Sequence, residues 1–203
     1  GGAVDDGFAF AQERGKLLLV KKCNPKLITG MWDLERADVR VAFPNQKTET
    51  SSFGNYSNSL YDMAVHERGT AAADTLYNAV FNNTAVYGKW LNGYRIHHRE
   101  VPWSVSLGHA DAAILFYHTA LYTVRTFPKR FEIVPLGGTP DNPQPVTGNA
   151  VVTLHAVHIA GTWTRKQYEA RERLMSALQS SEFTTILQRH GLLPVGRKSG
   201  LAQ

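Results

Sequence analysis

The sequence has little of what builds a covalently or metal-stabilised scaffold. It holds one cysteine, Cys23, which excludes an internal disulfide and a cysteine metal cluster. It has no apolar run of about 18 residues, the length that a membrane-spanning helix needs, so we expect no membrane span. It does not open on a basic segment followed by an apolar one. We therefore expect no signal peptide within it, which a mature or a truncated chain would equally lack.

The familiar motifs of catalysis are missing as well. The sequence has no GxSxG elbow, no P-loop, no GxGxxG turn and no HExxH helix. His97 and His98 are adjacent, and His155 and His158 are three positions apart, so each pair would point to opposite faces of a strand. We expect no enzyme activity, no cofactor and no metal site. A hydrolase or transferase that assembles distant histidines is the alternative.

Positive charge exceeds negative charge, with a formal net charge of +5. A basic surface suits an anionic ligand or a nucleic acid. The basic residues are scattered rather than clustered with aromatic residues, so we expect no nucleic-acid partner.

The chain is organised around residues 100–121, EVPWSVSLGHADAAILFYHTAL. Pro102 can open a short helix, where its missing N–H would be unpaired anyway, and Gly108 ends that helix. Residues 110–117 form an apolar run without alternation, which predicts a strand buried on both faces. A helical pattern resumes at Thr119. In such an α/β arrangement ligands bind at the carboxyl ends of the strands.

The rest of the chain alternates in the same way. We expect residues 1–7 to fray and 8–14 to form a loop or a helical remnant. Further strands are predicted at 16–20, 39–43, 131–135 and 151–159, and helices at 33–36, 53–64, 71–81, 86–91, 164–179 and 182–189.

Three stretches, in order, carry a resemblance to one family. The first is GKLLLVKKCNPKLI at 15–28, followed by Trp32-Asp33-Leu34. The second is GHAD at 108–111 with the strand that ends in Tyr117, and the third is SALQSSEFTTILQRHGLLP at 176–194. They resemble the crossing strand, the second lobe and the closing helix pair of type II periplasmic solute-binding proteins of ABC importers. Among the members of that family, they resemble the molybdate- and tungstate-binding proteins.

The resemblance implies an α/β fold with a mainly parallel sheet flanked by helices, in two lobes. Residues 1–20 would be a remnant of lobe I with the crossing strand, 21–140 lobe II, and 141–203 the return strand and closing helices of lobe I. Family members carry a longer segment before the crossing strand, whereas fifteen residues precede Lys16 here. Lobe I would be incomplete, and its uncovered apolar face would favour a homodimer.

The implied function is capture of a small anion between the two lobes, for an ABC importer. The ligand would be an oxyanion similar to molybdate, tungstate or sulfate, the compartment the periplasm, and the partners the permease and ATPase. A ligand-sensing effector domain of a regulator, which can share this fold, is one alternative. A binder of small organic anions is another.

The first group of site residues follows a predicted strand and precedes a helix. Hydroxyls and unpaired N–H groups at a helix N-terminus suit an oxyanion, which indicates Thr50, Ser51 and Ser52. Plain N-capping of the helix is the alternative.

The second group lies in the organising stretch. The resemblance implies backbone contacts at Val101 and Trp103, although Trp103 could equally be a core aromatic and Glu100 would repel an anion. Tyr117 and His118 end the buried strand and can donate hydrogen bonds to an anion. A buried, hydrogen-bonded structural pair is the alternative for these two.

Overall fold

The computed structural model describes residues 3–82, 90–92, 97 and 99–195. The chain divides into two compact units, and each is described by itself. Unit 1 takes the chain up to residue 13 and from 152 onward, and unit 2 comprises residues 14–151. The boundaries predicted after residues 20 and 140 both fall inside unit 2.

Unit 2 is built on a five-stranded sheet in the order β4-β3-β5-β2-β6. These strands are β2 (Lys16–Lys21), β3 (Val41–Phe43), β4 (Trp90–Asn92), β5 (Ala112–Phe116) and β6 (Phe131–Val134). β3 is parallel to β4 and β5, whereas β2 is antiparallel to both β5 and β6. The α/β class is confirmed, but the sheet is mixed rather than mainly parallel, because β2 runs against both its neighbours.

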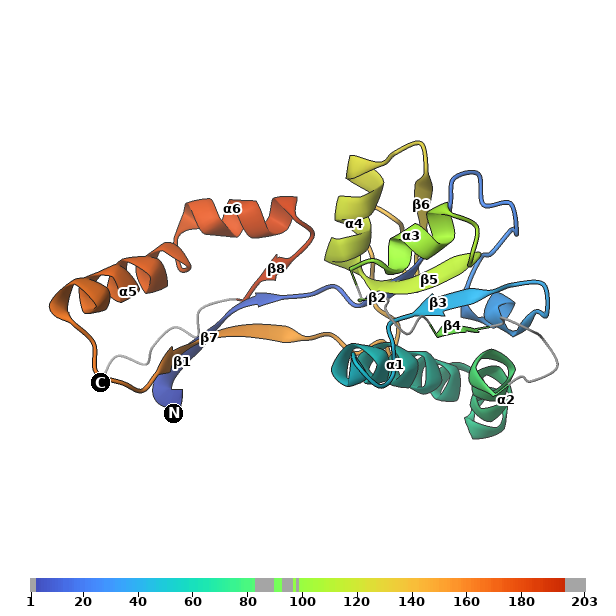
Figure 1. Cartoon of the computed structure of the whole chain (residues 1–203), viewed down its shortest axis with the longest axis horizontal. Coiled ribbons are helices and arrows are strands. Elements are labelled where there is room, and N and C mark those ends of the chain that lie inside the picture. The colour runs from blue at the N-terminus through green and yellow to red at the C-terminus, as the bar shows by residue number, and fades with distance from the viewer. Residues whose placement is uncertain (1–2, 83–89, 93–96, 98, 196–203) are drawn as a thin grey trace. The chain divides into compact units, whose positions relative to one another are not determined.

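Helices cover both faces of this sheet (Figure 1). One face packs against the short 3-10 helix η1 (Met31–Glu35) and the helices α1 (Thr50–Arg68) and α2 (Thr70–Phe81). The other face packs against α3 (Val101–Ser106) and α4 (Tyr117–Thr126). Alternation along β5 divides its side chains between the two layers, as expected for a pleated strand. Ile114 enters the first cluster and Leu115 the second.

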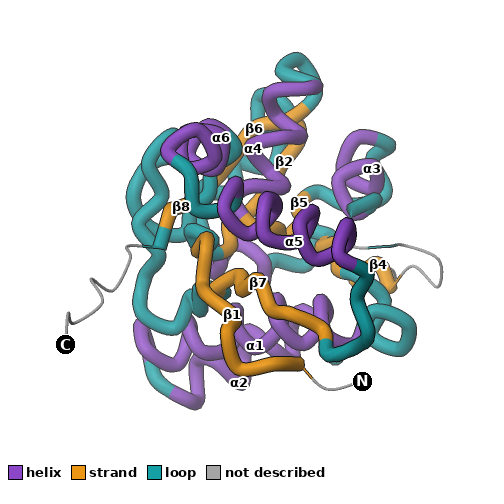
Figure 2. Tube along the Cα trace, turned by 90° about the vertical axis from the view of Figure 1, so that its left-hand side faces the viewer, coloured by secondary structure: helices purple, strands orange, loops and turns teal. Residues whose placement is uncertain are grey.

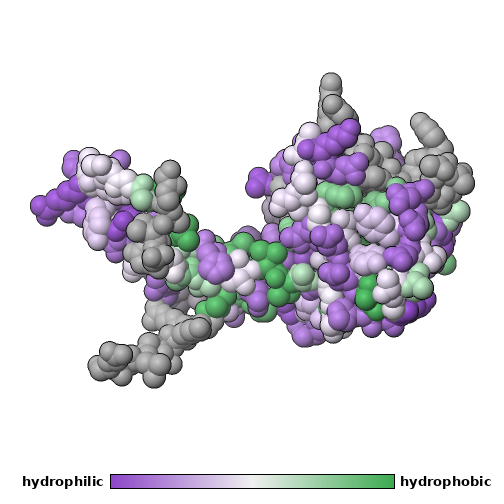
Figure 3. Space-filling model, turned by 90° about the horizontal axis from the view of Figure 1, so that it is seen from below, coloured by the Kyte–Doolittle hydropathy of each residue, from purple (hydrophilic) through white to green (hydrophobic). Residues whose placement is uncertain are grey.

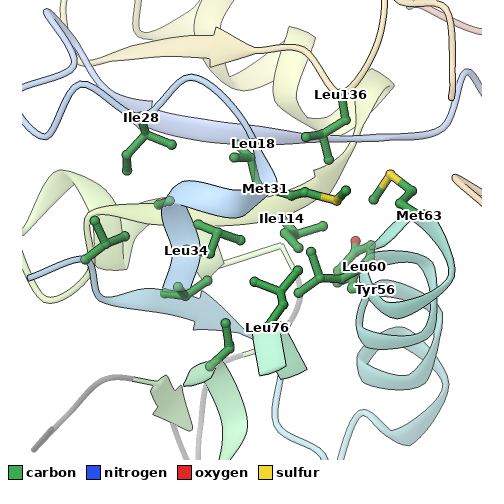
Figure 4. Close-up of a cluster of buried hydrophobic side chains, with 14 of the residues drawn as sticks. Leu18, Ile28, Met31, Leu34, Tyr56, Leu60, Met63, Leu76, Ile114 and Leu136 are labelled. Carbon is green, nitrogen blue, oxygen red and sulfur yellow. The ribbon is translucent and has the colours of Figure 1, made fainter. Parts of the chain in front are cut away.

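The first of the two clusters is the larger. Figure 4 shows Leu18 and Ile114 from the sheet meeting Leu34 from η1 and Leu60 and Leu76 from the two long helices. All five side chains are buried. Full burial of one such side chain stabilises a fold by roughly 1.5–3 kcal/mol. Unit 2 therefore carries a conventional two-sided core.

Several local predictions hold in unit 2, with one correction. α3 begins one residue before Pro102, and Gly108 follows it at a φ of 76° that glycine adopts without strain. The helix predicted at 86–91 is wrong where the structure describes that range, since Trp90–Asn92 form strand β4 by pairing with β3. The remainder of the prediction, 86–89, lies outside the described residues.

Unit 1 holds a three-stranded antiparallel sheet in the order β7-β1-β8 and two helices. Its elements are β1 (Ala3–Gln12), β7 (Thr153–Ile159), β8 (Leu193–Pro194), α5 (Arg165–Ala177) and α6 (Ser181–Arg189). Figure 2 shows β1 and β7 side by side. One ring contact between its layers joins Phe10 of β1 to Phe183 of α6, with centroids 6.1 Å apart.

The fraying expected at 3–7 and the loop or helical remnant expected at 8–12 are wrong, because β1 occupies these residues; the first two residues lie outside the described range. The Asp-Asp-Gly sequence at 5–7 conceals the strand, since these residue types are depleted in strands. Pairing with β7 overrides this preference, and the register shifts between Val4 and Phe8 absorb the irregular segment. Gly7 fits there because a Cβ would meet the Val157 side chain at 2.7 Å.

Among the described helices, none is both long enough and apolar enough to cross a membrane.

Candidate functional site

The carboxyl ends of β3 and β5 lie at the same edge of the sheet, because the two strands are parallel. α4 begins directly after β5, with Phe116 as its N-cap and Tyr117 as its first residue. α1 begins at Thr50, after the loop that follows β3. We call this region, made of these two strand ends and the starts of α1 and α4, the carboxyl edge. It is where the sequence predicts the ligand.

Around the start of α1, hydroxyls and carboxylates bond to one another. The Ser52 hydroxyl donates to the Glu49 carboxylate at 3.3 Å, and the Thr50 hydroxyl donates to the Gln46 carbonyl at 3.1 Å. Glu49, not a threonine or serine, is the N-cap, and its side chain makes no capping bond. Ser51 is exposed. Thr50, Ser51 and Ser52 therefore do not cap the helix with their side chains, which was the alternative to ligand binding.

A contact between two side chains links the N-cap of α1 to the segment before α3. His97 Nε2 lies 3.2 Å from Glu49 Oε1. The His97 backbone N–H also donates to the Glu100 carboxylate at 3.4 Å. Two carboxylates thus lie at this side of the carboxyl edge.

At the end of β5, three aromatic rings contact one another in series, the first pair edge-to-face and the second stacked. The Tyr56 and Phe116 ring centroids are 4.9 Å apart, and the Phe116 and His118 rings stack at 5.7 Å with an interplanar angle of 10°. Within the described residues, His118 Nδ1 is buried without a hydrogen-bond partner. Burial lowers the pKa of His118 below its ordinary value of 6.5, so the imidazole is neutral near pH 7. A neutral imidazole can offer a ligand one N–H or one lone pair.

Tyr117 points into the second core cluster, on the other face of the sheet from Phe116. Its hydroxyl donates to the Asp141 carbonyl at 3.4 Å, a long hydrogen bond that a ligand could replace. Burial raises the pKa of Tyr117, and the nearby Arg14 opposes that shift only in part. The phenol is therefore a neutral donor across the physiological range.

The structure adds two cations that sequence reasoning missed. Arg14 has its guanidinium carbon 5.5 Å from the Tyr117 ring centroid and donates to the Pro143 carbonyl at 3.1 Å. Lys16 is buried, donates to the Ala150 carbonyl, and has its Nζ 5.3 Å from the Phe116 ring centroid. The β2–β5 register pairs Lys16 with Phe116. In the sequence, the only signal was that a lysine begins an apolar strand. That Lys16 lies beside Phe116 follows from the antiparallel direction of β2, which the sequence does not show.

The other two predicted residues are placed differently. Val101 is fully buried in the second core cluster. Trp103 packs its ring 5.1 Å from that of Phe127, at the far end of α4 from His118. The Trp103 backbone N–H donates to the Glu100 carbonyl at 2.9 Å. The structure therefore brings Tyr117 and His118 to the carboxyl edge together with the start of α1, whereas the Trp103 side chain lies elsewhere.

No set of three or more potential metal ligands comes together in the parts of the chain that the structure describes.

Comparisons with known proteins agree with this fold. The chain is similar to PEB3 bound to L-phospholactate, with a TM-score of 0.57 and 15% identity, covering 92% of this chain and 68% of the other; Peb3 from Campylobacter jejuni is similar too. It is also similar to the sulfate-binding protein SubI from Mycobacterium tuberculosis, with a TM-score of 0.61 and 18% identity, covering 93% and 58%. A ferric binding protein from Bordetella matches with a TM-score of 0.52 and 16% identity, covering 97% and 59%.

These likenesses establish the type II periplasmic-binding fold, and the chain spans about three fifths to two thirds of the length of the three proteins. No curated protein matches the sequence closely enough to count as a relative. A model of the family described as bacterial extracellular solute-binding proteins matches residues 2–193, nearly the whole chain. That family consists of binding proteins rather than enzymes. This chain belongs to the bacterial extracellular solute-binding protein family.

Proposed function

We propose that this chain captures a small anion at the carboxyl edge of unit 2, as the solute-binding component of an ABC importer. The observation that carries the proposal is the pair of cations beside the end of β5. Arg14 and Lys16 contact Tyr117 and Phe116, next to the neutral His118 whose Nδ1 has no partner in the described chain. Positive charge and an unused polar group thus surround the end of β5, with Arg14 beside Tyr117 and Lys16 beside Phe116, whose ring stacks on His118.

The chemistry of capture follows from these groups. A hydrogen bond between a charged group and a ligand contributes roughly 1.5–3 kcal/mol, about twice that of a neutral pair. The neutral Tyr117 phenol supplies a further donor without needing a proton from solvent. Because Lys16 is buried, its attraction for an anion is screened less than that of a surface lysine.

For the ligand we propose an oxyanion similar to molybdate, tungstate or sulfate. The likeness to the sulfate-binding SubI supports this class. A small organic anion is the second candidate, and two observations favour it. PEB3, which has the same fold, was solved with L-phospholactate. Glu49 and Glu100 would repel a bare oxyanion, whereas a hydroxyl on an organic anion could donate to them.

The proposed contacts retain all seven predicted positions. Tyr117 and His118 would contribute side chains, supported by Arg14 and Lys16. The start of α1 would contribute backbone N–H groups. The full set of predicted contacts is Thr50, Ser51, Ser52, Val101, Trp103, Tyr117 and His118.

For partners and compartment we propose an importer's permease and ATPase, and the periplasm. The support is the family itself, whose members are extracellular solute-binding proteins. The likeness to an ABC transporter structure from Clostridium perfringens, with a TM-score of 0.54, is consistent with this assignment.

Isothermal titration calorimetry tests the proposal, with sulfate, molybdate, tungstate and phospholactate titrated separately. One of these anions should bind, and Arg14→Gln and His118→Gln should each weaken it by about tenfold, the equivalent of 1.4 kcal/mol. Arg173→Gln on exposed α5 is the matched charge control and should bind as the wild type does. Absence of binding with all four anions, or equal binding by Arg14→Gln and the wild type, would contradict the proposal.

We further propose that unit 1 buries its apolar residues against a second copy of the chain. Within α5, all of which is described, no residue is buried, and Leu174 is 59% exposed. On β7, Val157 and Ile159 are exposed too, and hydrophobic residues gather over the strands of unit 1 in Figure 3. Analytical ultracentrifugation should find a dimer that Ile159→Lys dissociates. A monomer at all concentrations would rule this out.

A further inference from the structure

A second cationic site lies at the other edge of the unit 2 sheet. Because β2 is antiparallel to β5, its first residue pairs with Phe116 at the carboxyl edge and its last residues lie at the opposite edge. There a pocket of about 360 Å³ opens between the end of β2, the end of α3 and the turn before β6. Its lining comprises Lys21, Lys22, Cys23, Ser106, Lys129 and Arg130.

The charge of this pocket is one-sided. Four of its six lining residues are cations, and none is an acid. Glu132 neutralises one of them, with 3.6 Å between its carboxylate and Lys22 Nζ. Lys21 and Lys129 form no ion pair with any residue that the structure describes. Like charges gathered around one pocket repel one another, and an anion in the pocket would relieve that repulsion.

The cationic groups are held in place by the fold. β2 and β6 are paired with Lys21 opposite Phe131, and the Lys22 N–H donates to the Arg130 carbonyl at 2.8 Å. The Arg130 guanidinium donates to the Ser106 hydroxyl at 3.2 Å, which ties it to α3. The Cys23 N–H donates to the Glu132 carboxylate at 3.2 Å, so the turn that follows β2 is fixed to β6 as well. The pocket is thus built by three elements of one unit.

We propose that this pocket binds a phosphate group. A guanidinium fork, two ammonium groups and a hydroxyl are the donors that recognise phosphate oxygens in proteins. The volume is near the lower end for ligand pockets, about 300–1,000 Å³, which suits a phosphate or a small phosphomonoester rather than a large ligand. The bound phosphate group could belong to a dissolved molecule or to the headgroup of an anionic lipid.

Cys23 makes the proposal testable at the site itself, because it lines the pocket and is the chain's single cysteine. The rate of its alkylation by neutral iodoacetamide is measured while inorganic phosphate is titrated at constant ionic strength. Phosphate should slow the alkylation several-fold and saturably, and chloride should not. Arg130→Gln should raise the half-saturating phosphate concentration by about tenfold or more, as expected for the loss of a charge-assisted contact.

Further variants separate the loss of a phosphate contact from a disturbed fold or a general loss of charge. Lys129→Gln removes an exposed charge and leaves the hydrogen bond between Arg130 and Ser106 intact. It should weaken the protection of Cys23 by phosphate, and it remains a valid test if Arg130→Gln disturbs the fold. Arg173→Gln and Arg14→Gln should leave the protection of Cys23 unchanged. Arg14→Gln also separates this site from the anion site proposed at the carboxyl edge, since it should affect that site alone.

A second arm identifies the source of the phosphate. Vesicles of phosphatidylglycerol and phosphatidylcholine replace inorganic phosphate, with pure phosphatidylcholine vesicles as the control. If inorganic phosphate alone protects Cys23, the ligand is a dissolved phosphate compound. If anionic vesicles protect Cys23, the ligand is a lipid headgroup. The proposal is overturned if neither protects Cys23 in the wild type, or if protection is unchanged in both Arg130→Gln and Lys129→Gln.

Discussion

Units 1 and 2 belong to one chain but use their apolar residues in opposite ways. Unit 2 encloses its sheet between two helical layers and buries the aliphatic side chains of β2 and β5 on both faces. In unit 1, Ile159 of β7 is 64% exposed and Leu174 of α5 is 59% exposed. Surface this apolar usually marks an interaction site.

The difference lies in sheet architecture rather than composition. A sheet of five strands with helices above and below gives each inward side chain a partner. A sheet of three strands, one of them two residues long, gives its helices little to pack on. Small sheets of this kind are marginal unless something else covers them. We therefore expect unit 2 to carry most of the stability of the chain, because among the described hydrophobic residues of unit 1 only Ala11 and Leu187 are buried.

Truncation of matched aliphatic side chains would show this contrast most strongly. Ile114→Ala, in a fully buried position of β5, should lower the free energy of unfolding by about 2–5 kcal/mol through lost burial and a cavity. Leu174→Ala on α5 should change it by only about 0.5 kcal/mol at low protein concentration. Urea unfolding, with hydrogen exchange to assign each transition to a unit, measures both. Similar losses in the two variants would contradict the division of stability between the units.

How far the sequence predicted this contrast differs between elements. The α3–β5–α4 region follows from local signals, because Pro102, Gly108 and the apolar run up to Tyr117 each fix one boundary. The direction of β2 has no local signal, since strand polarity depends on which distant strand pairs with it. The location of Lys16 at the carboxyl edge, and so part of the candidate site, was therefore beyond sequence reasoning. The series of ring contacts from Tyr56 through Phe116 to His118 also joins residues from two helices and a strand, at spacings no motif records.

A smaller loss of stability should follow from removing the side chain that forms hydrogen bonds to the backbone of the first residue of β2. Asn149 is buried, accepts from the Lys16 N–H at 2.8 Å and donates to the Lys16 carbonyl at 2.8 Å, as a neighbouring strand would. Asn149→Ala leaves both backbone groups without these bonds, and an unsatisfied buried group costs about 1–3 kcal/mol. We expect a loss of stability within that range, measured by urea unfolding.

Asn78→Ala is the control for this variant. Asn78 lies on the exposed side of α2 and bonds only to the side chain of Asn82 among the described side chains. Its replacement should change stability by less than about 0.5 kcal/mol. If the two asparagine variants lose equally little stability, the hydrogen bonds of Asn149 do not stabilise the start of β2.

The smallest effect should be a pH dependence from His118. Burial lowers its pKa in the folded chain below 6.5, whereas the unfolded chain keeps a pKa near that value. As the pH falls through 6.5, the unfolded state takes up the proton first, and stability falls with it. The loss ends once the pH is below the folded-state pKa. His118→Gln should therefore flatten the stability profile of unit 2 below pH 6.5. A bound anion beside the ring would favour imidazolium and raise the pKa of His118. It would therefore reduce the fall of stability below pH 6.5 in the wild type alone.

Urea unfolding midpoints between pH 5 and pH 8 measure both profiles. Identical profiles for the wild type and His118→Gln would contradict a buried neutral imidazole at the carboxyl edge.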